Sequence, residues 1–250
     1  MWRAVRHRWR WIRSHRKPGR VRLTGKQWAV LVVFAATAVV VASGIGAPQR
    51  KPSSVDVWAV AQARADLATV SVLDRRPPHD RDYRRDAFGP AWTDDARVSG
   101  GGNACDTRND VLARDLTVTA RVVTSSCAQA VAAGTFVSPY TGRSIGFRRG
   151  RSSAAVQIDH IVPLSLAWDL GAAAWPQSRR WSFANDPRNL VAVDAASNQA
   201  KSDYEPARWM PPLRGFHCQY AVQFVVVLVA YDLPIDSPSR DTLDEALGGC

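Results

Sequence analysis

The chain has 250 residues, of which 46% are hydrophobic, and a formal net charge of +11. This hydrophobic share is ordinary for a globular protein, which excludes a chain too polar to form a core. The first 27 residues hold ten of the 33 basic residues and no acidic one, so the rest has 23 basic against 22 acidic residues. The basic excess therefore belongs to the N-terminal tail. We interpret this tail first as a signal that sets the orientation of the chain in a membrane, and second as a nucleic-acid-binding arm.

Residues 28–47 form an uncharged, apolar segment directly after this basic tail, 1–27. A helix needs about 20 such residues to cross a bilayer, and preceding positive charges favour an N-terminus inside the cell. We therefore expect a single-pass anchor in the cell membrane through 28–47, with the C-terminal domain outside the cytoplasm. Small residues at 42–47 keep a second interpretation open, a signal peptide whose cleavage releases the rest as a secreted protein.

A linker at 48–54 and a helix over 55–73, with apolar residues at helical spacing, are predicted next and make up the segment 48–87. Residues 74–104 are rich in Arg, Asp, Pro and Gly and predict loops. The remainder, 88–250, has the alternation of short strands and helices that is typical of an α+β domain. In chain order we predict a helix at 108–115, strands at 116–123, 134–147 (two, with a tight turn) and 156–162, helices at 164–174 and 177–185, a strand at 189–193, and helices at 194–202, 221–230 and 236–248.

Four cysteines, all beyond the apolar segment, predict two disulfides in an oxidising compartment, with three possible pairings. We favour Cys105–Cys127 and Cys218–Cys250, because each pair closes a local loop. A zinc site is disfavoured, since the chain has no CxxC pair and no histidine at zinc-finger spacing.

Asp159 and His160 stand side by side in the otherwise apolar strand predicted at 156–162. Neighbours on a strand point to opposite faces. The two groups can therefore serve one site only if a metal lies on one side and a water on the other, or if the backbone twists. The plainer interpretation is a surface salt bridge at a strand end.

Asn189 opens the next predicted strand, and Asn198 lies on the helix predicted after it. This order resembles the HNH, or ββα-metal, endonucleases. The longer run DHIVPL…FANDPRNLVAVDAASNQAKSDYEPARW resembles the C-terminal nuclease domain of GmrSD-type restriction enzymes and related secreted bacterial proteins. CDTRNDVL at 105–112 and SPYTGRSI at 138–145 fit the same family. The resemblance spans about 88–250 and implies a ββα-metal core with additional helices. The expected transmembrane helix lies before this domain.

The resemblance also implies roles for the four polar residues. His160 would be the general base, for which imidazole, with an ordinary pKa near 6.5, is suited. Asp159 and Asn198 would bind one divalent cation, and their oxygen ligands favour Mg²⁺ or Mn²⁺ over zinc. Asn189 would brace the loop and orient His160. The expected activity is endonucleolytic hydrolysis of phosphodiester bonds in DNA, or in RNA.

Several basic residues are candidates for phosphate binding. Lys201 follows Asn198 by three positions and shares its helix face, where it either touches a phosphate or is a solvated surface charge. Arg143 and Arg148, with Arg149 and Arg151, flank the predicted hairpin and form a candidate patch. Arg108 is implied by the resemblance alone. The tryptophans near the motif are predicted to pack in the core rather than stack on bases: Trp168, Trp175, Trp181 and Trp209.

Two alternatives to an enzyme stay open. The first is a catalytically inactive nuclease-like domain that binds nucleic acid or an envelope partner. The second is a membrane-anchored structural protein, which predicts no cleft at His160. The enzyme hypothesis requires the oxygen atoms of Asp159 and Asn198 to converge, with a His160 nitrogen beside them. The sequence itself indicates no protein partner.

Overall fold

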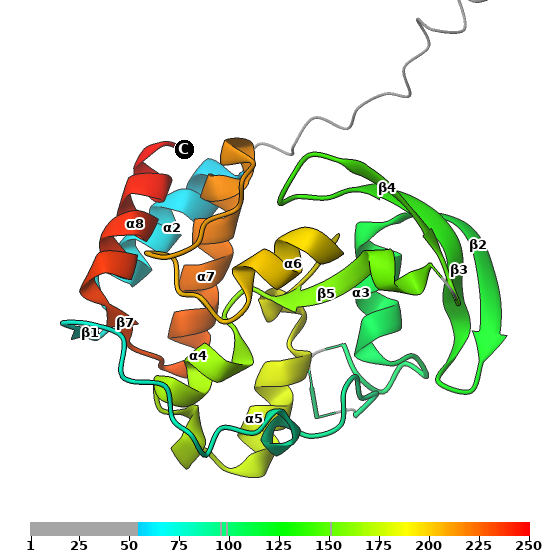
Figure 1. The fold of residues 1–250 in the computed structure, drawn as a ribbon, viewed down its shortest axis with the longest axis horizontal. Helices are drawn as coiled ribbons and strands as arrows, with labels where there is room; N and C mark the ends of the chain where they lie inside the picture. Colours follow the sequence, from blue (N-terminus) through cyan, green and yellow to red (C-terminus); the bar gives the residue numbers. More distant parts are fainter. Residues whose placement is uncertain (1–54, 96, 99, 151) are drawn as a thin grey trace, which may run out of the picture. The chain divides into compact units, whose positions relative to one another are not determined.

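A computed structural model describes residues 55–250 except 96, 99 and 151, so the predicted tail 1–27 and apolar segment 28–47 lie outside the described residues. Within the described part no helix is both long enough and apolar enough to cross a membrane. The fold mixes α and β (Figure 1). Its helices and strands are α2 (Val57–Leu67), β1 (Val72–Leu73), α3 (Thr107–Asp115), β2 (Thr117–Thr124), β3 (Cys127–Val137), β4 (Ser144–Arg148), β5 (Val156–His160), α4 (Leu164–Asp169), α5 (Gln177–Asn185), β6 (Leu190–Asp194), α6 (Ala195–Lys201), α7 (His217–Tyr231), β7 (Ile235–Asp236) and α8 (Ser237–Gly248), with short 3-10 turns that include η1 (Arg85–Phe88), η3 (Ala172–Ala174) and η4 (Pro187–Asn189).

Strands β5 and β6 form an antiparallel pair whose register runs from Val156 opposite Asp194 to His160 opposite Leu190. Residues 161–189, which contain α4 and α5, connect the two strands. Helix α6 follows β6 directly, because the Asp194 side chain accepts a hydrogen bond from the Ser197 amide and caps the helix. Figure 1 shows α6 lying beside β5. This part of the chain places the DH pair and Asn198 on adjoining elements.

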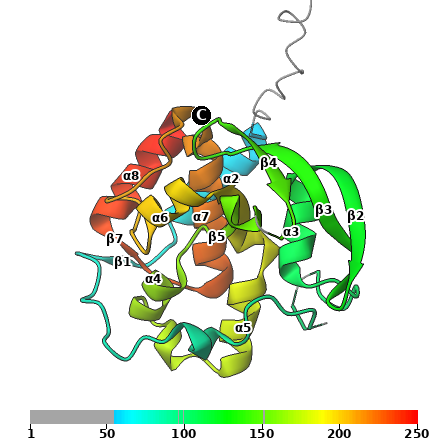
Figure 2. The same ribbon diagram turned by 45° about the vertical axis from the view of Figure 1, so that its right-hand side comes forward.

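A three-stranded antiparallel sheet, β2–β3–β4, curves around α3 (Figures 1 and 2). Its apolar side and one side of α3 share a core with alternate residues of β5. Val156 and Ile158 on β5 pack into this core, so their face of the strand is turned toward α3 and the curved sheet. The buried members of this core are Val111, Leu112, Leu116, Val131, Phe136, Phe147, Val156, Ile158, Leu190 and Ala192.

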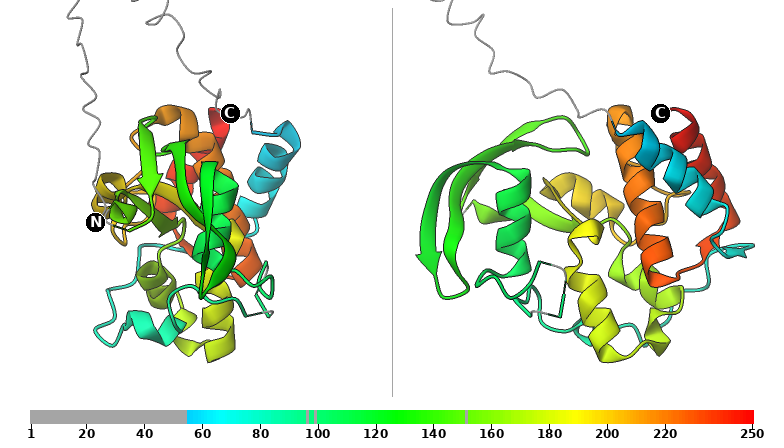
Figure 3. Two further views of the ribbon diagram at one scale, coloured as in Figure 1. Left: turned by 90° about the vertical axis from the view of Figure 1, so that its right-hand side faces the viewer. Right: turned by 180° about the vertical axis from the view of Figure 1, so that it is seen from behind.

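A larger core joins α4 and α5 to the helices α2, α7 and α8, which pack side by side (Figure 3). Helix α7 is buried along most of its length, as predicted for the run 221–230. Helix α2 contributes Ala63 and Leu67 to this core, so the helix that we assigned to a separate segment at 48–87 packs within the same compact unit, 52–250.

Two predicted helices end earlier than expected. The helix predicted over 55–73 stops at Leu67, because Val72 and Leu73 pair in parallel with Ile235 and Asp236. The helix predicted over 164–174 breaks after Asp169, where Gly171 adopts φ 123°. A positive φ of this kind is incompatible with a continuing α-helix, so the chain restarts as the 3-10 turn η3.

Both disulfides have the predicted pairing. Cys105–Cys127 joins the loop before α3 to the first residue of β3. Cys218–Cys250 joins the first turn of α7 to the chain's last residue, beyond α8. The two bonds therefore brace the curved sheet and the helical layer separately.

Candidate functional site

The end of β5 carries Asp159 and His160, each only 6% exposed. The neighbours on β5 face different surroundings, as the alternation of a strand requires. Gln157 and Asp159 bond to side chains of α6. His160 instead lines a pocket between η1, the loop that follows it and the end of α5. The two groups of the DH pair therefore belong to different faces of one strand.

The imidazole of His160 is held in one orientation by two contacts. Its Nε2 lies 2.9 Å from the backbone oxygen of Ala184. A carbonyl oxygen only accepts, so Nε2 carries a proton and donates it, and Nδ1 bears the lone pair of the neutral ring. The Trp92 ring stacks against the imidazole with centroids 5.9 Å apart and an interplanar angle of 9°. The ring is thereby oriented with one nitrogen free to accept a proton.

Burial determines the charge of His160. It lowers the pKa of the imidazole from 6.5 to about 3, against the opposing effect of the bond to Ala184, and the positive charges of Arg85 and Lys201 act in the same direction as burial. The ring is therefore neutral at pH 7, the form that a base requires.

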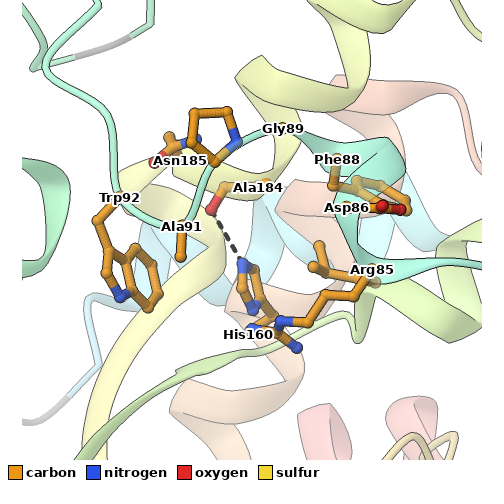
Figure 4. Close-up of a pocket in the computed structure, with 11 residues that line it drawn as sticks. Arg85, Asp86, Phe88, Gly89, Ala91, Trp92, His160, Ala184 and Asn185 are labelled. Atoms are coloured by element: carbon orange, nitrogen blue, oxygen red, sulfur yellow. Dashed lines mark hydrogen bonds between the residues drawn. The ribbon is translucent and has the colours of Figure 1, made fainter.

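The pocket in front of His160 has a volume of about 410 Å³. Figure 4 shows the His160 ring between Trp92 on one side and Arg85 on the other, with the Ala184 carbonyl facing the ring. Our sequence interpretation missed Arg85 and Trp92, because they lie in the polar stretch 74–104 that we assigned to loops. An isolated Trp in such a stretch was the only signal, and it is not specific. The pocket is lined by Arg85, Asp86, Phe88, Gly89, Pro90, Ala91, Trp92, His160, Leu164, Ala184 and Asn185.

On the other face of β5, a buried lysine pairs with Asp159. Lys201 Nζ lies 3.0 Å from Asp159 Oδ2 and 3.2 Å from Oδ1, and it donates a bond of 2.8 Å to the backbone oxygen of His160. The Tyr140 hydroxyl donates to Asp159 Oδ2 at 2.5 Å. Lys201 is 0% exposed, so it is not the solvated surface charge that was one of our two interpretations. Burial lowers the pKa of Lys201, and the charge of Asp159 opposes that effect.

Asn198 lies on the same face of α6 as Lys201 and donates from Nδ2 to Gln157 Oε1 at 2.7 Å. Carboxylate and amide oxygens are thus gathered under α6, and their chemistry is suited to a hard cation. However, the ammonium of Lys201 already neutralises the Asp159 carboxylate, and a divalent ion bound there would be repelled by it. No group of three or more His, Cys, Asp or Glu side chains in the described residues is arranged to hold a metal. In this arrangement the expected pair of ligands does not fit a divalent cation.

Asn189 is fully buried and holds the chain where it leaves β5. Its Oδ1 accepts from the Val162 amide at 2.8 Å, its Nδ2 donates to the Val162 oxygen at 3.2 Å, and its own backbone oxygen accepts from Ile161 at 2.8 Å. The residues just after His160 are therefore tied to the start of β6.

The basic residues that we predicted for phosphate binding lie outside the pocket. Arg108 is half-buried and donates to the backbone oxygen of Val156 at 3.2 Å. Arg143 and Arg148 are exposed on the β3–β4 hairpin, and neither lines the pocket of His160. Among the described residues, Arg85 is the basic residue that shares this pocket.

Two comparisons show which known proteins this chain resembles. Residues 106–235 match the family described as GmrSD restriction endonucleases, C-terminal domain. A protein of Arthroderma benhamiae, described as an uncharacterized secreted protein, is 37% identical over 226 residues, which cover 90% of this chain and 100% of that relative. No solved structure matches this chain. Strands β5 and β6 and helix α6 fall within the matched residues, whereas η1 and Trp92 precede them.

Proposed function

Because the chain belongs to the family of the GmrSD restriction endonuclease C-terminal domain, we propose that it is a nuclease in which His160 is the general base. The observation that carries this proposal is the orientation of the His160 ring. Its Nε2 is committed to the Ala184 oxygen, and its Nδ1 is left to accept a proton in a pocket open to a substrate.

In the proposed reaction, Nδ1 of His160 takes a proton from a water molecule whose oxygen forms a bond to phosphorus. The ester bond from phosphorus to the leaving sugar oxygen breaks, and that oxygen takes a proton from solvent. The bond from Nε2 to Ala184 keeps the ring in place during the transfer and stabilises the imidazolium that forms. A pKa of about 3 makes the free base weak, and the negative charge of a bound phosphodiester raises it.

We propose DNA as the substrate, with RNA as the alternative. The family implies Mg²⁺ or Mn²⁺ as the cofactor, and we keep this as a proposal that does not use Asp159 and Asn198 as the ligands in the arrangement described. These choices rest on the family alone. Since Asp159 and Asn198 do not fit a divalent ion while Lys201 stands beside the carboxylate, no step above passes through a metal.

We also propose that the domain works outside the cytoplasm, either anchored through residues 28–47 or released after cleavage. The two disulfides support an oxidising compartment, and the Arthroderma benhamiae relative is described as secreted.

The test compares cleavage of plasmid DNA and of a single-stranded RNA by the full chain and by His160→Ala, each with Mg²⁺, Mn²⁺ or EDTA. Removal of a general base is expected to lower the rate by roughly 10²–10⁴-fold. His217→Ala is the matched control, because His217 also bonds through Nε2 to a backbone oxygen, that of Pro211, but lies outside the pocket.

Equal cleavage by the full chain and His160→Ala would overturn the proposed role of His160. Absence of cleavage by the unaltered protein with either metal would favour an inactive nuclease-like domain that binds nucleic acid. Thermal unfolding of both variants establishes that a lost rate is not a lost fold.

A further inference from the structure

The wall of the pocket that η1 forms contains an arginine whose charge is not neutralised by a neighbour. Arg85 is exposed, and the described residues provide no ion-pair or hydrogen-bond partner for its guanidinium. The other arginines near this wall are engaged: Arg84 pairs with Asp86 at 3.8 Å, and Arg180 donates to the Ala87 oxygen at 2.9 Å. Asp86 also lines the pocket, but its carboxylate is the partner of Arg84.

We propose that Arg85 binds the phosphate group of a nucleic-acid strand next to His160, a role that rests on the proposed nuclease function. A guanidinium presents paired N–H donors that match two phosphate oxygens, and it keeps its charge at any physiological pH. A phosphate held there lies beside the imidazole, so the same arginine also faces the negative charge that grows on the phosphoryl oxygens during hydrolysis.

The wall that carries Arg85 is fixed to the rest of the domain. Phe88, three residues further on, is 1% exposed and belongs to the larger core. Gly89 ends the turn, and its amide donates to the Asp86 oxygen at 2.9 Å. Its φ is +83°, and an added Cβ would lie 2.2 Å from Trp181 Nε1. Close packing of backbone against Trp181 therefore sets the distance between η1 and α5, and with it the place of Arg85.

Electrostatics in the pocket agree with an anionic ligand. The positive charges of Arg85 and Lys201 both act on His160, and both disfavour its protonated form. Lys201 is buried on the other face of β5 and paired with Asp159. Arg85 is therefore the cation that a ligand in the pocket can reach. The described part of the chain thus places one accessible guanidinium and one neutral base on the same pocket.

The test measures binding separately from cleavage. His160→Ala serves as the background, because the proposed function predicts that it cleaves the probe too slowly to matter during the measurement. The probe is a short fluorescently labelled single-stranded DNA, and its binding is followed by anisotropy. Adding Arg85→Ala is expected to weaken binding roughly 10-fold, as loss of a charge-assisted bidentate contact does. The slope of log K against log salt concentration is expected to fall by about 0.7, the value for one phosphate contact on a single strand. Arg85→Lys restores the slope but only part of the affinity.

Arg81→Ala is the matched control, since Arg81 is an exposed arginine four residues before Arg85 that does not line the pocket, and it is expected to leave both affinity and slope unchanged. Unchanged affinity and slope for Arg85→Ala would overturn the inference, as would absence of any binding at low salt. The proposed function can fail independently. If the unaltered protein cleaves nothing while Arg85→Ala still weakens binding, the phosphate site stands without the nuclease activity.

Discussion

The ion pair between Asp159 and Lys201 is the residue-scale feature with most bearing on cofactor use. Both partners are buried, and a lone buried carboxylate or ammonium would be strongly destabilising. The sequence placed Lys201 on the same helix face as Asn198, which is correct. It could not show that this face packs on β5. Helical spacing tells which residues share a face of a helix, but it does not tell which other element that face contacts.

Replacement of Lys201 is expected to separate structural from metal-binding roles of Asp159. Lys201→Met leaves the carboxylate buried with Tyr140 as its remaining donor, which we expect to lower the free energy of unfolding by about 3–5 kcal/mol. A divalent cation can then take the place of the ammonium. Mn²⁺ should therefore raise the midpoint of thermal unfolding of Lys201→Met more than that of the unaltered protein.

The double variant Lys201→Met, Asp159→Asn is the control, because it removes both charges. It should recover most of the lost stability and show no added response to Mn²⁺. Equal Mn²⁺ shifts in all three proteins would contradict competition between Lys201 and the cation.

At the scale of elements, periodicity and capping predicted the strands and helices around the DH pair well. Asp194 and Asp236 cap α6 and α8, whose ranges match the predicted helices, and the strand predicted at 156–162 is observed as β5, which ends at His160. The turn η1 was not predicted, because its position depends on a tertiary contact between Gly89 and Trp181 that no local pattern encodes. The half of the pocket built from 85–92 was therefore missed, and the half built from β5 was found.

Gly89→Ala is expected to displace η1. The φ of +83° and ψ of −174° lie in a region that is almost restricted to glycine, and forcing an alanine there costs about 1–3 kcal/mol. The added methyl also collides with the Trp181 ring. We expect single-stranded DNA to bind more weakly, by a factor similar to that of Arg85→Ala, with a small fall in the midpoint of thermal unfolding.

Gly146→Ala on β4 is the matched substitution, because an added Cβ there meets nothing within 4 Å. It should change neither binding nor stability by a measurable amount. Unaltered DNA binding by Gly89→Ala would contradict the idea that this contact positions Arg85.

For the whole molecule, three aspartates make stability depend on pH. Burial would raise the pKa of each, but hydrogen bonds to the charged form outweigh it and lower the pKa below 3.8. The donors are Arg188 and Tyr231 for Asp186, Ser138, Ser197 and Thr141 for Asp194, and Arg76 and Ser165 for Asp203. A lower pKa in the folded than in the unfolded protein means that the ionised forms stabilise the fold above the ordinary pKa. This stabilisation is lost as pH falls through the folded values.

The lowered pKa of His160 adds to this effect, because below about pH 6.5 the imidazole takes up a proton in the unfolded chain and not in the fold. The midpoint of thermal unfolding should therefore begin to fall below about pH 6.5 and fall most steeply between about pH 5 and about pH 2. Asp186→Asn should reduce this acid dependence and lower the stability at pH 7, since Arg188 and Tyr231 lose a charged partner. The exposed Asp241→Asn serves as the comparison. Equal stability at pH 3 and pH 7 would contradict the prediction.

The two walls of the His160 pocket come from separate stretches of chain. One wall consists of β5 and α5, inside the residues that match the family, and the other of residues 85–92, before them. Exchange of Arg85, Asp86, Pro90 and Ala91 for residues of different charge or bulk, with Phe88, Gly89 and Trp92 kept, would leave the base, its contacts with Trp92 and Ala184, and both disulfides in place. Under the proposed function, the choice of ligand can therefore be changed at these positions alone, which makes them the first targets for redirecting the protein to a new substrate.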